Sequence, residues 1–328
     1  MSEALVLVFT ALMGAAVLAY VILDGYDLGV GMLMPAAKDD EQQRMVNSIG
    51  PFWDANETWL VLGIGLLLVA FPRAHGIVLG ALYLPVAAML VGLMFRGVAF
   101  EFRVKAHGWH RELWNWLFWA GSFLASFAQG LMLGRYVTGF DRGFGSWLFA
   151  VVVGGALCGG YVLLGATWLI LRTDGALQRK AIAWARWGLA WVALGVALVS
   201  LAMPLVSQTI REKWFAFPLI VALSPLPLGS LLAGFFLYRS LGRSDWKPFA
   251  CAVAIFVLAF AGLAYSLFPY VVMDRMTIWD AAADKSALGF LLAGAAVVLP
   301  FIAGYTIYVY RVFGGKAKPG DLYGETRL

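Results

Sequence analysis

Charged residues are scarce in this chain of 328 residues. Only 13% of them are Asp, Glu, Lys or Arg, whereas 62% are hydrophobic. An ordinary soluble domain carries roughly 25% charged residues. A globule in water must expose part of its surface, and this composition offers too little polar surface for that. The composition therefore excludes an ordinary soluble protein and predicts a chain whose apolar surface is covered by lipid.

Cysteine and histidine are also rare, and their positions exclude several chemistries. The chain has two cysteines and three histidines. Cys158 and Cys251 lie inside apolar runs, which is typical of small buried residues and not of a disulfide framework. His75, His107 and His110 lie outside the apolar runs, so no predicted span offers the axial histidine that a buried haem usually needs. We therefore predict that this chain itself binds no haem and no metal.

Several further signatures are missing from the sequence. It has no phosphate-binding loop, dinucleotide fingerprint or nucleophile elbow. The net charge of +5 comes from basic residues scattered between apolar runs, so we expect no nucleic-acid partner. The runs do not alternate apolar and polar residues, which excludes a membrane β-barrel. Alone, the chain is not expected to run redox or hydrolytic chemistry, and we predict no catalytic residue in it.

Nine apolar runs approach the roughly 20 residues that a membrane-spanning helix needs. The predicted fold class is therefore all-α, a polytopic membrane protein with a bundle of about nine transmembrane helices in a single domain over residues 1–328. Interior prolines Pro218, Pro225 and Pro227 should kink the seventh helix. The predicted helices span residues 4–34, 53–72, 76–95, 113–133, 147–171, 187–206, 214–237, 249–272 and 287–310.

Basic residues are distributed unevenly between the two sides of the predicted bundle. Most of the 24 Lys and Arg residues follow odd-numbered helices, including Lys316, Lys318 and Arg327 after the ninth. The positive-inside rule then places the N-terminus outside and the C-terminus in the cytoplasm. The odd number of helices agrees with that orientation.

Two acidic residues, Asp24 and Asp27, interrupt the first predicted helix. They are three positions apart and share one helix face. The roughly 30 Å of apolar helix before Asp24 places the pair toward the cytoplasmic side. Ionisable groups within a span are usually functional, which favours proton entry or relay; the alternative is an interfacial acid pair that bonds a neighbouring helix. Gly25 and Gly29 form a small-residue face that lets another helix approach closely.

Polar residues also open the second predicted helix. Asp54 fits an ordinary helix start, because acids favour the positive end of the helix dipole. Together with Asn56 and Glu57, however, it makes this segment too polar for a simple cap. We expect these residues and Asp24 to form a polar funnel at the cytoplasmic edge, where a partly buried carboxylate can pass protons.

The third predicted helix ends with further charged residues on the same side. Arg96 is expected to pair with Asp24 or Asp54 and keep that acid ionised, although it can also be read as a basic membrane anchor. For Glu101 too, proton transfer and a purely structural position at the membrane edge are both open. Arg103 is better explained as an anchor.

Four motifs resemble those of subunit II of the cytochrome bd-type quinol oxidases. They are DGYDLGVGML at 24–33, NSIGPFWDANETWL at 47–60, FRGVAFEFR at 95–103, and FPY at 268–270 followed by TIWDA at 277–281. They occur in the family's order and cover essentially the whole chain. The motif residues include Gly25, Asp27, Gly29, Trp53, Asn56, Trp279 and Asp280.

The resemblance implies a nine-helix, haem-free subunit in the bacterial inner membrane, paired with a haem-bearing subunit I. Subunit I of the family holds haem b and haem d, or a b-type variant, together with the quinol site. The complex oxidises ubiquinol and reduces oxygen to water with protons from the cytoplasm. The family context also implies membrane lipids, a small single-helix accessory subunit and a structural quinone as further partners. Acids that match Asp24 and Asp54 belong to a proton route in the family.

We therefore expect a structural and proton-conducting subunit. Asp24 and Asp54 are the first candidates for proton transfer, followed by Glu57, Arg96 and Glu101. The Glu57-Thr58 pair and the short predicted loops resemble the cyanide-insensitive branch of the family. A secondary transporter remains the alternative, although it predicts broken helices near the midplane and often inverted repeats. A membrane anchor without a proton route is a third hypothesis.

Overall fold

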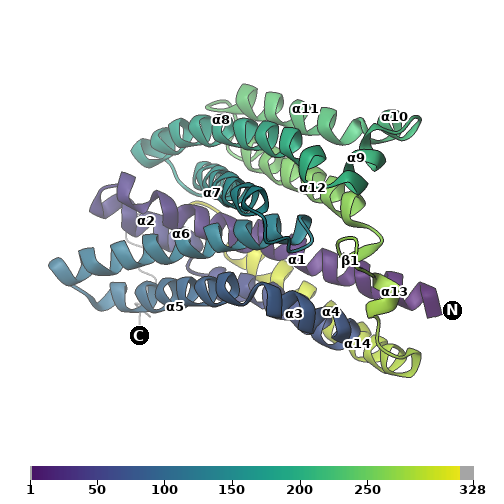
Figure 1. The fold of residues 1–328 in the computed structure, drawn as a ribbon. Helices are drawn as coiled ribbons and strands as arrows, with labels where there is room; N and C mark the ends of the chain where they lie inside the picture. The colour runs from purple at the N-terminus through teal and green to yellow at the C-terminus, as the bar shows by residue number, and fades with distance from the viewer. Residues whose placement is uncertain (1, 318–328) are drawn as a thin grey trace.

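The computed structural model describes residues 2–317, which are helical almost throughout (Figure 1). Nine helices in this part of the chain are long and apolar enough to cross a membrane, which confirms an all-α polytopic fold. Lys318 and Arg327, which contribute to the predicted charge asymmetry, lie outside the described residues. The spanning helices are α1 (Ser2–Leu33), α3 (Trp53–Ala70), α5 (Tyr83–Lys105), α6 (Trp109–Val137), α7 (Phe144–Arg172), α8 (Gly175–Val206), α10 (Leu219–Leu223) with α11 (Pro225–Ser240) as one span, α12 (Lys247–Leu267) and α14 (Lys285–Val312).

The remaining elements are short and lie between the spans. A two-stranded antiparallel hairpin, β1 with β2, follows α12. The short elements are the 3-10 helix η1 (Met34–Ala36), α2 (Asp39–Ile49), α4 (Pro72–Ala81), α9 (Gln208–Phe215), β1 (Tyr270–Val272), β2 (Met276–Thr277) and α13 (Ile278–Ala281).

The third span differs most from its predicted position. The prediction was 76–95, whereas the structure has α4 over Pro72–Ala81 and the span α5 over Tyr83–Lys105. Pro85 lies in the first turn of α5, where its missing N–H costs no helical hydrogen bond, so a helix can restart there. The predicted end before Arg96 was wrong because α5 continues past this arginine for more than two turns. Arg96 is paired with acids inside the bundle and therefore does not mark the membrane edge.

Prolines explain two other boundaries. The predicted eighth helix, 249–272, ends early at Leu267, because Pro269 cannot continue it and the chain turns into β1. The seventh span is interrupted as the prolines predicted, since α10 begins after Pro218 and α11 begins at Pro225.

The sixth helix, predicted over 187–206, begins earlier, at Gly175.

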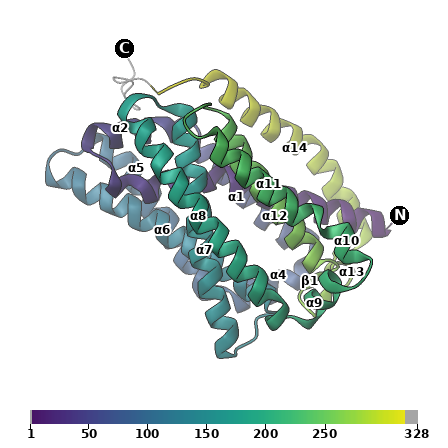
Figure 2. The same ribbon diagram turned by 90° about the horizontal axis from the view of Figure 1, so that it is seen from above.

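Helices α1 and α7 occupy the centre of the bundle. Helix α1 packs against α3, α6 and α7, and α7 also contacts α8 and α12. Helix α11 lies along α12, and α14 lies at the periphery beside α1 and α3 (Figure 2). We call the end that carries α2 the α2 end, and the end that carries β1, β2 and α13 the hairpin end. Helix α1 begins at the hairpin end, and the last described residues lie at the α2 end (Figure 1).

The central pair of helices is held close by glycine, as the small-residue face predicts. A Cβ atom added to Gly29 would lie 1.8 Å from the carbonyl oxygen of Tyr161, and one added to Gly165 would lie 2.4 Å from the backbone of Gly29. A Cβ at Gly25 would lie 2.7 Å from the Tyr161 ring. The backbones of α1 and α7 therefore touch directly, which places Asp24 and Asp27 deep in the bundle.

Helix α2 is an amphipathic helix that the sequence analysis did not predict, because it is short and rich in charge. Its Glu41 accepts hydrogen bonds from the Lys180 ammonium group of α8 (2.5 Å) and from the Lys38 backbone N–H (2.8 Å). Arg44 pairs with Asp174 in the connection before α8. These contacts fasten α2 across the end of the bundle.

We expect Gly29→Ala to destabilise the protein strongly. The new methyl group would overlap the Tyr161 backbone, which cannot move as a side chain can, so α1 and α7 must separate at a cost of about 3 kcal/mol or more. The measurement is the melting temperature of the detergent-purified protein. Gly294→Ala is the matched control, because a Cβ there meets no atom within 4 Å. Equal melting temperatures for the two variants would contradict the close approach.

We expect the stabilising effect of Glu41 to depend on pH. Burial opposes its ionisation, but the bonds from Lys180 and Lys38 hold its pKa below the usual value of 4.5. Its ionised form therefore stabilises the fold fully above about pH 4.5, and the contribution is lost as the pH falls through the lower folded value. Glu41→Gln should lower the free energy of unfolding by about 1 kcal/mol at pH 7 and by less below about pH 4, as measured by thermal melting. Asp40→Asn, at an exposed position on the same helix, is the control; a Glu41→Gln cost that is constant with pH would refute the expectation.

Candidate functional site

A buried arginine joins three helices toward the α2 end of the bundle. Arg96 of α5 donates from Nη1 to Asp24 Oδ1 of α1 (2.5 Å) and from Nη2 to Glu57 of α3. The side chains of Arg96 and Asp24 are 2% and 0% exposed, whereas that of Glu57 is 29% exposed. A buried charge is costly unless it is paired and hydrogen-bonded, and the forked guanidinium suits two carboxylates at once. We call Asp24, Glu57 and Arg96 the ion cluster.

A second polar group surrounds Asn56 of α3. It includes Asp27, which lies one turn beyond Asp24 on α1. The Asn56 amide donates to Asp27 Oδ2 (2.7 Å) and to the Tyr26 hydroxyl (2.9 Å), and its oxygen accepts from the Tyr310 hydroxyl (3.1 Å). The Tyr26 and Tyr310 hydroxyl oxygens are 2.5 Å apart. Asn56 therefore ties α1 and α3 to the last helix, α14. Asp27 takes part in none of the salt bridges within residues 2–317.

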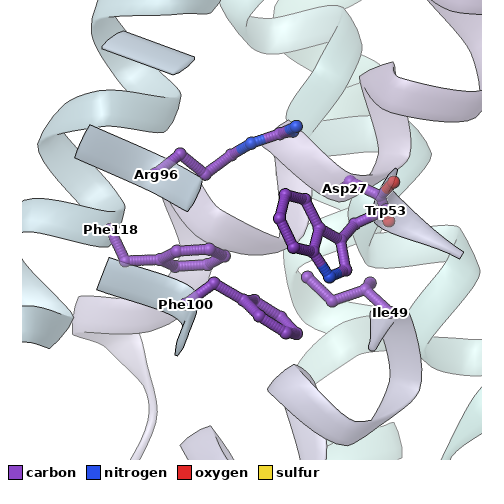
Figure 3. A pocket seen from close by; sticks show the side chains of 6 residues that line it. All are labelled: Asp27, Ile49, Trp53, Arg96, Phe100 and Phe118. Carbon is purple, nitrogen blue, oxygen red and sulfur yellow. The ribbon is translucent and has the colours of Figure 1, made fainter. Parts of the chain in front are cut away.

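A narrow cavity borders both groups (Figure 3). It has no room for a water molecule. Figure 3 shows the Trp53 indole between Asp27 and the two phenylalanine rings, with Arg96 above. Asp24 Oδ2 and Asp27 Oδ1 are buried and have no hydrogen-bond partner. The cavity is lined by Asp27, Ile49, Trp53, Arg96, Phe100 and Phe118.

The structure brings together three of the five predicted proton-transfer candidates, namely Asp24, Glu57 and Arg96. Arg96 pairs with Asp24 and Glu57, not with Asp54. Asp54 and Glu101 are exposed on the surfaces of α3 and α5. The four acids therefore divide into two that contact Arg96 and two that face outward.

Sequence reasoning missed the tyrosines that bond to this region. Tyr310 lies 254 positions from its partner Asn56, and a tyrosine near the end of a span usually belongs to the aromatic belt. Gln129 of α6 did carry a usable signal, because an amide in the middle of an apolar helix usually bonds across to another helix. It contacts the hydroxyl groups of Tyr20 and Tyr161.

The whole chain also matches a known protein family. A family model described as cytochrome bd terminal oxidase subunit II matches residues 5–313. The chain belongs to this family. It is 29% identical to cytochrome bd ubiquinol oxidase subunit 2 of Bacillus subtilis, over 90% of this chain and 91% of that protein. It is 27% identical to cytochrome bd-I ubiquinol oxidase subunit 2 of Escherichia coli, over 99% of this chain and 98% of that protein.

Within this subunit II, the TIWDA motif has a structural explanation at the hairpin end. Asp280 accepts hydrogen bonds from the Thr277 backbone N–H (3.0 Å) and hydroxyl (2.6 Å), which keep its pKa below the usual value. Arg73 donates to the Asp280 carbonyl oxygen (3.1 Å), and the Trp279 ring contacts that of Phe268. The motif is a capping box that begins α13 and ties it to α4.

The three histidines lie outside the buried interior of the bundle. His75 is half-buried in α4, and His107 and His110 are exposed near the connection from α5 to α6. The His110 ring is stacked on Trp109, with centroids 3.8 Å apart. Across residues 2–317, no three His, Cys, Asp or Glu side chains lie close enough to hold a metal ion.

We expect Arg96→Met to destabilise the subunit by about 3–5 kcal/mol, because it leaves Asp24 and Glu57 without their cation. The double variant Arg96→Met with Asp24→Asn should recover part of the loss, since it removes one of the two uncompensated charges. Thermal melting of the purified protein measures both effects. Arg243→Met, at an exposed position, is the control. If Arg96→Met has the same melting temperature as the Arg243→Met control, the pairing does not stabilise the fold.

Proposed function

We propose that this chain is the haem-free second subunit of a ubiquinol:oxygen oxidoreductase in the aerobic respiratory chain. In this proposal its buried acids carry protons from the cytoplasm for the reduction of oxygen to water. The observation that carries it is the ion cluster with Asp27 beside it: three carboxyl groups and one guanidinium gathered where α1, α3 and α5 meet, with Asp24, Asp27 and Arg96 buried. Ionisable groups this deep in a span mark proton or substrate pathways more often than anchors.

The proposal assigns the redox chemistry to the partner. Haem b and haem d, or a b-type variant, and the quinol site lie on subunit I, and those haems supply the electron transfer to oxygen. This chain contributes support and proton transfer as a single transmembrane domain of the inner membrane. Its N-terminus then lies outside, and the α2 end faces the cytoplasm.

The balance of charge explains how the cluster can handle protons. Three carboxyl groups face one guanidinium, so full ionisation would leave uncompensated negative charge in a medium of low dielectric constant. When one of these carboxyl groups binds or releases a proton, the net charge of the cluster changes, and no helix has to move. The unpartnered oxygens of Asp24 and Asp27 are free positions for such a proton.

The exposed acids indicate where the partner packs. Asp54 and Glu101 lie on the surfaces of spanning helices, where a carboxylate facing hydrocarbon would be costly. We place the haem-bearing subunit over this surface of α3 and α5. The same position would let Asp54 exchange protons between the two chains.

The proposal is tested by purifying the complex in mild detergent through a tag on this chain. We expect a haem-bearing partner in the mass spectrum, haem bands in the visible spectrum and quinol-dependent oxygen consumption. The isolated chain should be colourless. A stable, colourless preparation of this chain alone, with no partner, would instead favour a transporter.

In the same complex, Asp24→Asn should lower quinol-dependent oxygen consumption by about 100-fold, the low end for loss of a positioned proton-transfer group. The haem bands should stay unchanged, because Asp24 lies in the haem-free chain. Asp284→Asn removes an exposed acid before α14 and should retain full activity. If Asp24→Asn also turns over at the normal rate, the chain is an anchor without a proton route.

A further inference from the structure

A buried chain of hydrogen bonds leads from α7 through α6 to α1, directly beside the ion cluster. The Tyr161 hydroxyl donates to Gln129 Oε1 (2.6 Å), and Gln129 Nε2 donates to the Tyr20 hydroxyl oxygen (2.8 Å). Tyr20 and Tyr161 are 3% and 0% exposed. Tyr20 lies one helical turn before Asp24 on α1, so the two side chains share one face of the helix.

We propose that Gln129 is a positioning residue that acts through Tyr20 on Asp24. It directs the Tyr20 hydroxyl proton toward the second oxygen of the Asp24 carboxylate, the oxygen that Arg96 does not hold. The inference rests on the proton-transfer role proposed for Asp24, and it names two residues that tune this role.

The direction of the hydrogen bonds carries the argument. A side-chain amide offers one accepting oxygen and one donating nitrogen, and here Tyr161 occupies the oxygen. The nitrogen must then donate to Tyr20, so the hydroxyl proton of Tyr20 is left for another acceptor. Asp24 Oδ2 is a buried acceptor without a partner, and Oδ1 is already held by Arg96. In this proposal Tyr20 supplies the donor that Asp24 Oδ2 lacks.

The opposite orientation of the Gln129 amide would be less favourable. Its oxygen would then accept the proton of Tyr20, and no donor would remain for Asp24 Oδ2. Hydrogen bonds to an ionised acceptor are about twice as strong as those between neutral groups. A buried charged oxygen without a donor is also costly. Both effects favour the arrangement in which the amide releases the Tyr20 proton toward Asp24.

Close helix packing makes this chain of contacts geometrically feasible. The Tyr161 ring lies against Gly25, where a Cβ would come within 2.7 Å of it. Helices α6 and α7 approach just as closely at Gly130, where a Cβ would lie 2.5 Å from the backbone of Gly154. Small residues therefore set the distances between α1, α6 and α7 in this region.

The test uses the whole oxidase complex with the variants Tyr20→Phe, Gln129→Met and the two combined. We expect each single variant to lower quinol-dependent oxygen consumption by about tenfold, the size of one lost hydrogen bond to a charged group. The combination should lose no more than either alone, because both act through one hydroxyl proton. Ser126→Ala is the control on α6, since that hydroxyl donates to the Ser122 carbonyl oxygen of its own helix.

Infrared spectroscopy supplies a measurement that is independent of turnover. The bands of the Asp24 carboxyl group are identified by their loss in Asp24→Asn, and they should shift in Tyr20→Phe and in the same direction in Gln129→Met. Unshifted bands in an intact Gln129→Met complex, or additive losses of activity, would overturn the inference. If Asp24→Asn keeps full turnover, the proton route fails, but the band shifts still decide whether Gln129 positions Asp24.

If Tyr20→Phe or Gln129→Met prevents assembly of the oxidase complex, the variant Tyr161→Phe is measured in its place. This change removes one hydroxyl and allows the Gln129 oxygen to accept the proton of Tyr20. We expect a band shift in the same direction. Bands like those of the unsubstituted complex would count against the proposal.

Discussion

The enclosure of Arg96 by Asp24 and Glu57 is the interaction on which the rest of this site depends. A guanidinium inside a membrane protein must be neutralised within the protein, because hydrocarbon cannot solvate it. Its two acids lie on two different helices, so α1, α3 and α5 have to meet at one depth. The same pairing lets α5 remain a membrane span beyond its arginine. One buried cation thus determines both the position of three helices and the place where carboxyl groups gather.

The glycine contacts between α1 and α7 supply the second constraint. Direct backbone contact at Gly29 and Gly165 holds the acidic stretch of α1 at the centre of the bundle, out of reach of lipid. It also brings Tyr161 within reach of Gln129 and, through it, Tyr20. The small residues of the DGYDLGVG motif and its acids therefore serve one purpose, because the acids are buried only where the glycines permit close packing.

Composition and hydrophobic runs were sufficient to predict the fold class and the nine spans, and the four motifs predicted the family. They also predicted that Asp24 and Asp27 share a helix face and that Arg96 meets an acid. The choice between Asp24 and Asp54 could not be made, because it depends on how α3 is rotated against α1 and α5. The bond from Tyr310 to Asn56 joins residues 254 positions apart, and no local pattern indicates it. Two helix ends were also missed. Helix α12 ends at Leu267 because a turn follows before Pro269, and α5 continues beyond Arg96 because this arginine is buried in an ion pair.

The small cavity beside Trp53 bears on how protons reach the cluster from the α2 end. Its aromatic lining leaves no room for water, so a continuous column of water does not cross it in this structure. Glu57 is the member of the ion cluster that reaches the surface, and Asp54, three residues before it, lies on the same side of α3. Access through these two acids would pass along a surface that we assign to the partner subunit. In this proposal the complex completes the route, because the partner subunit covers the outward-facing acids of α3 and α5.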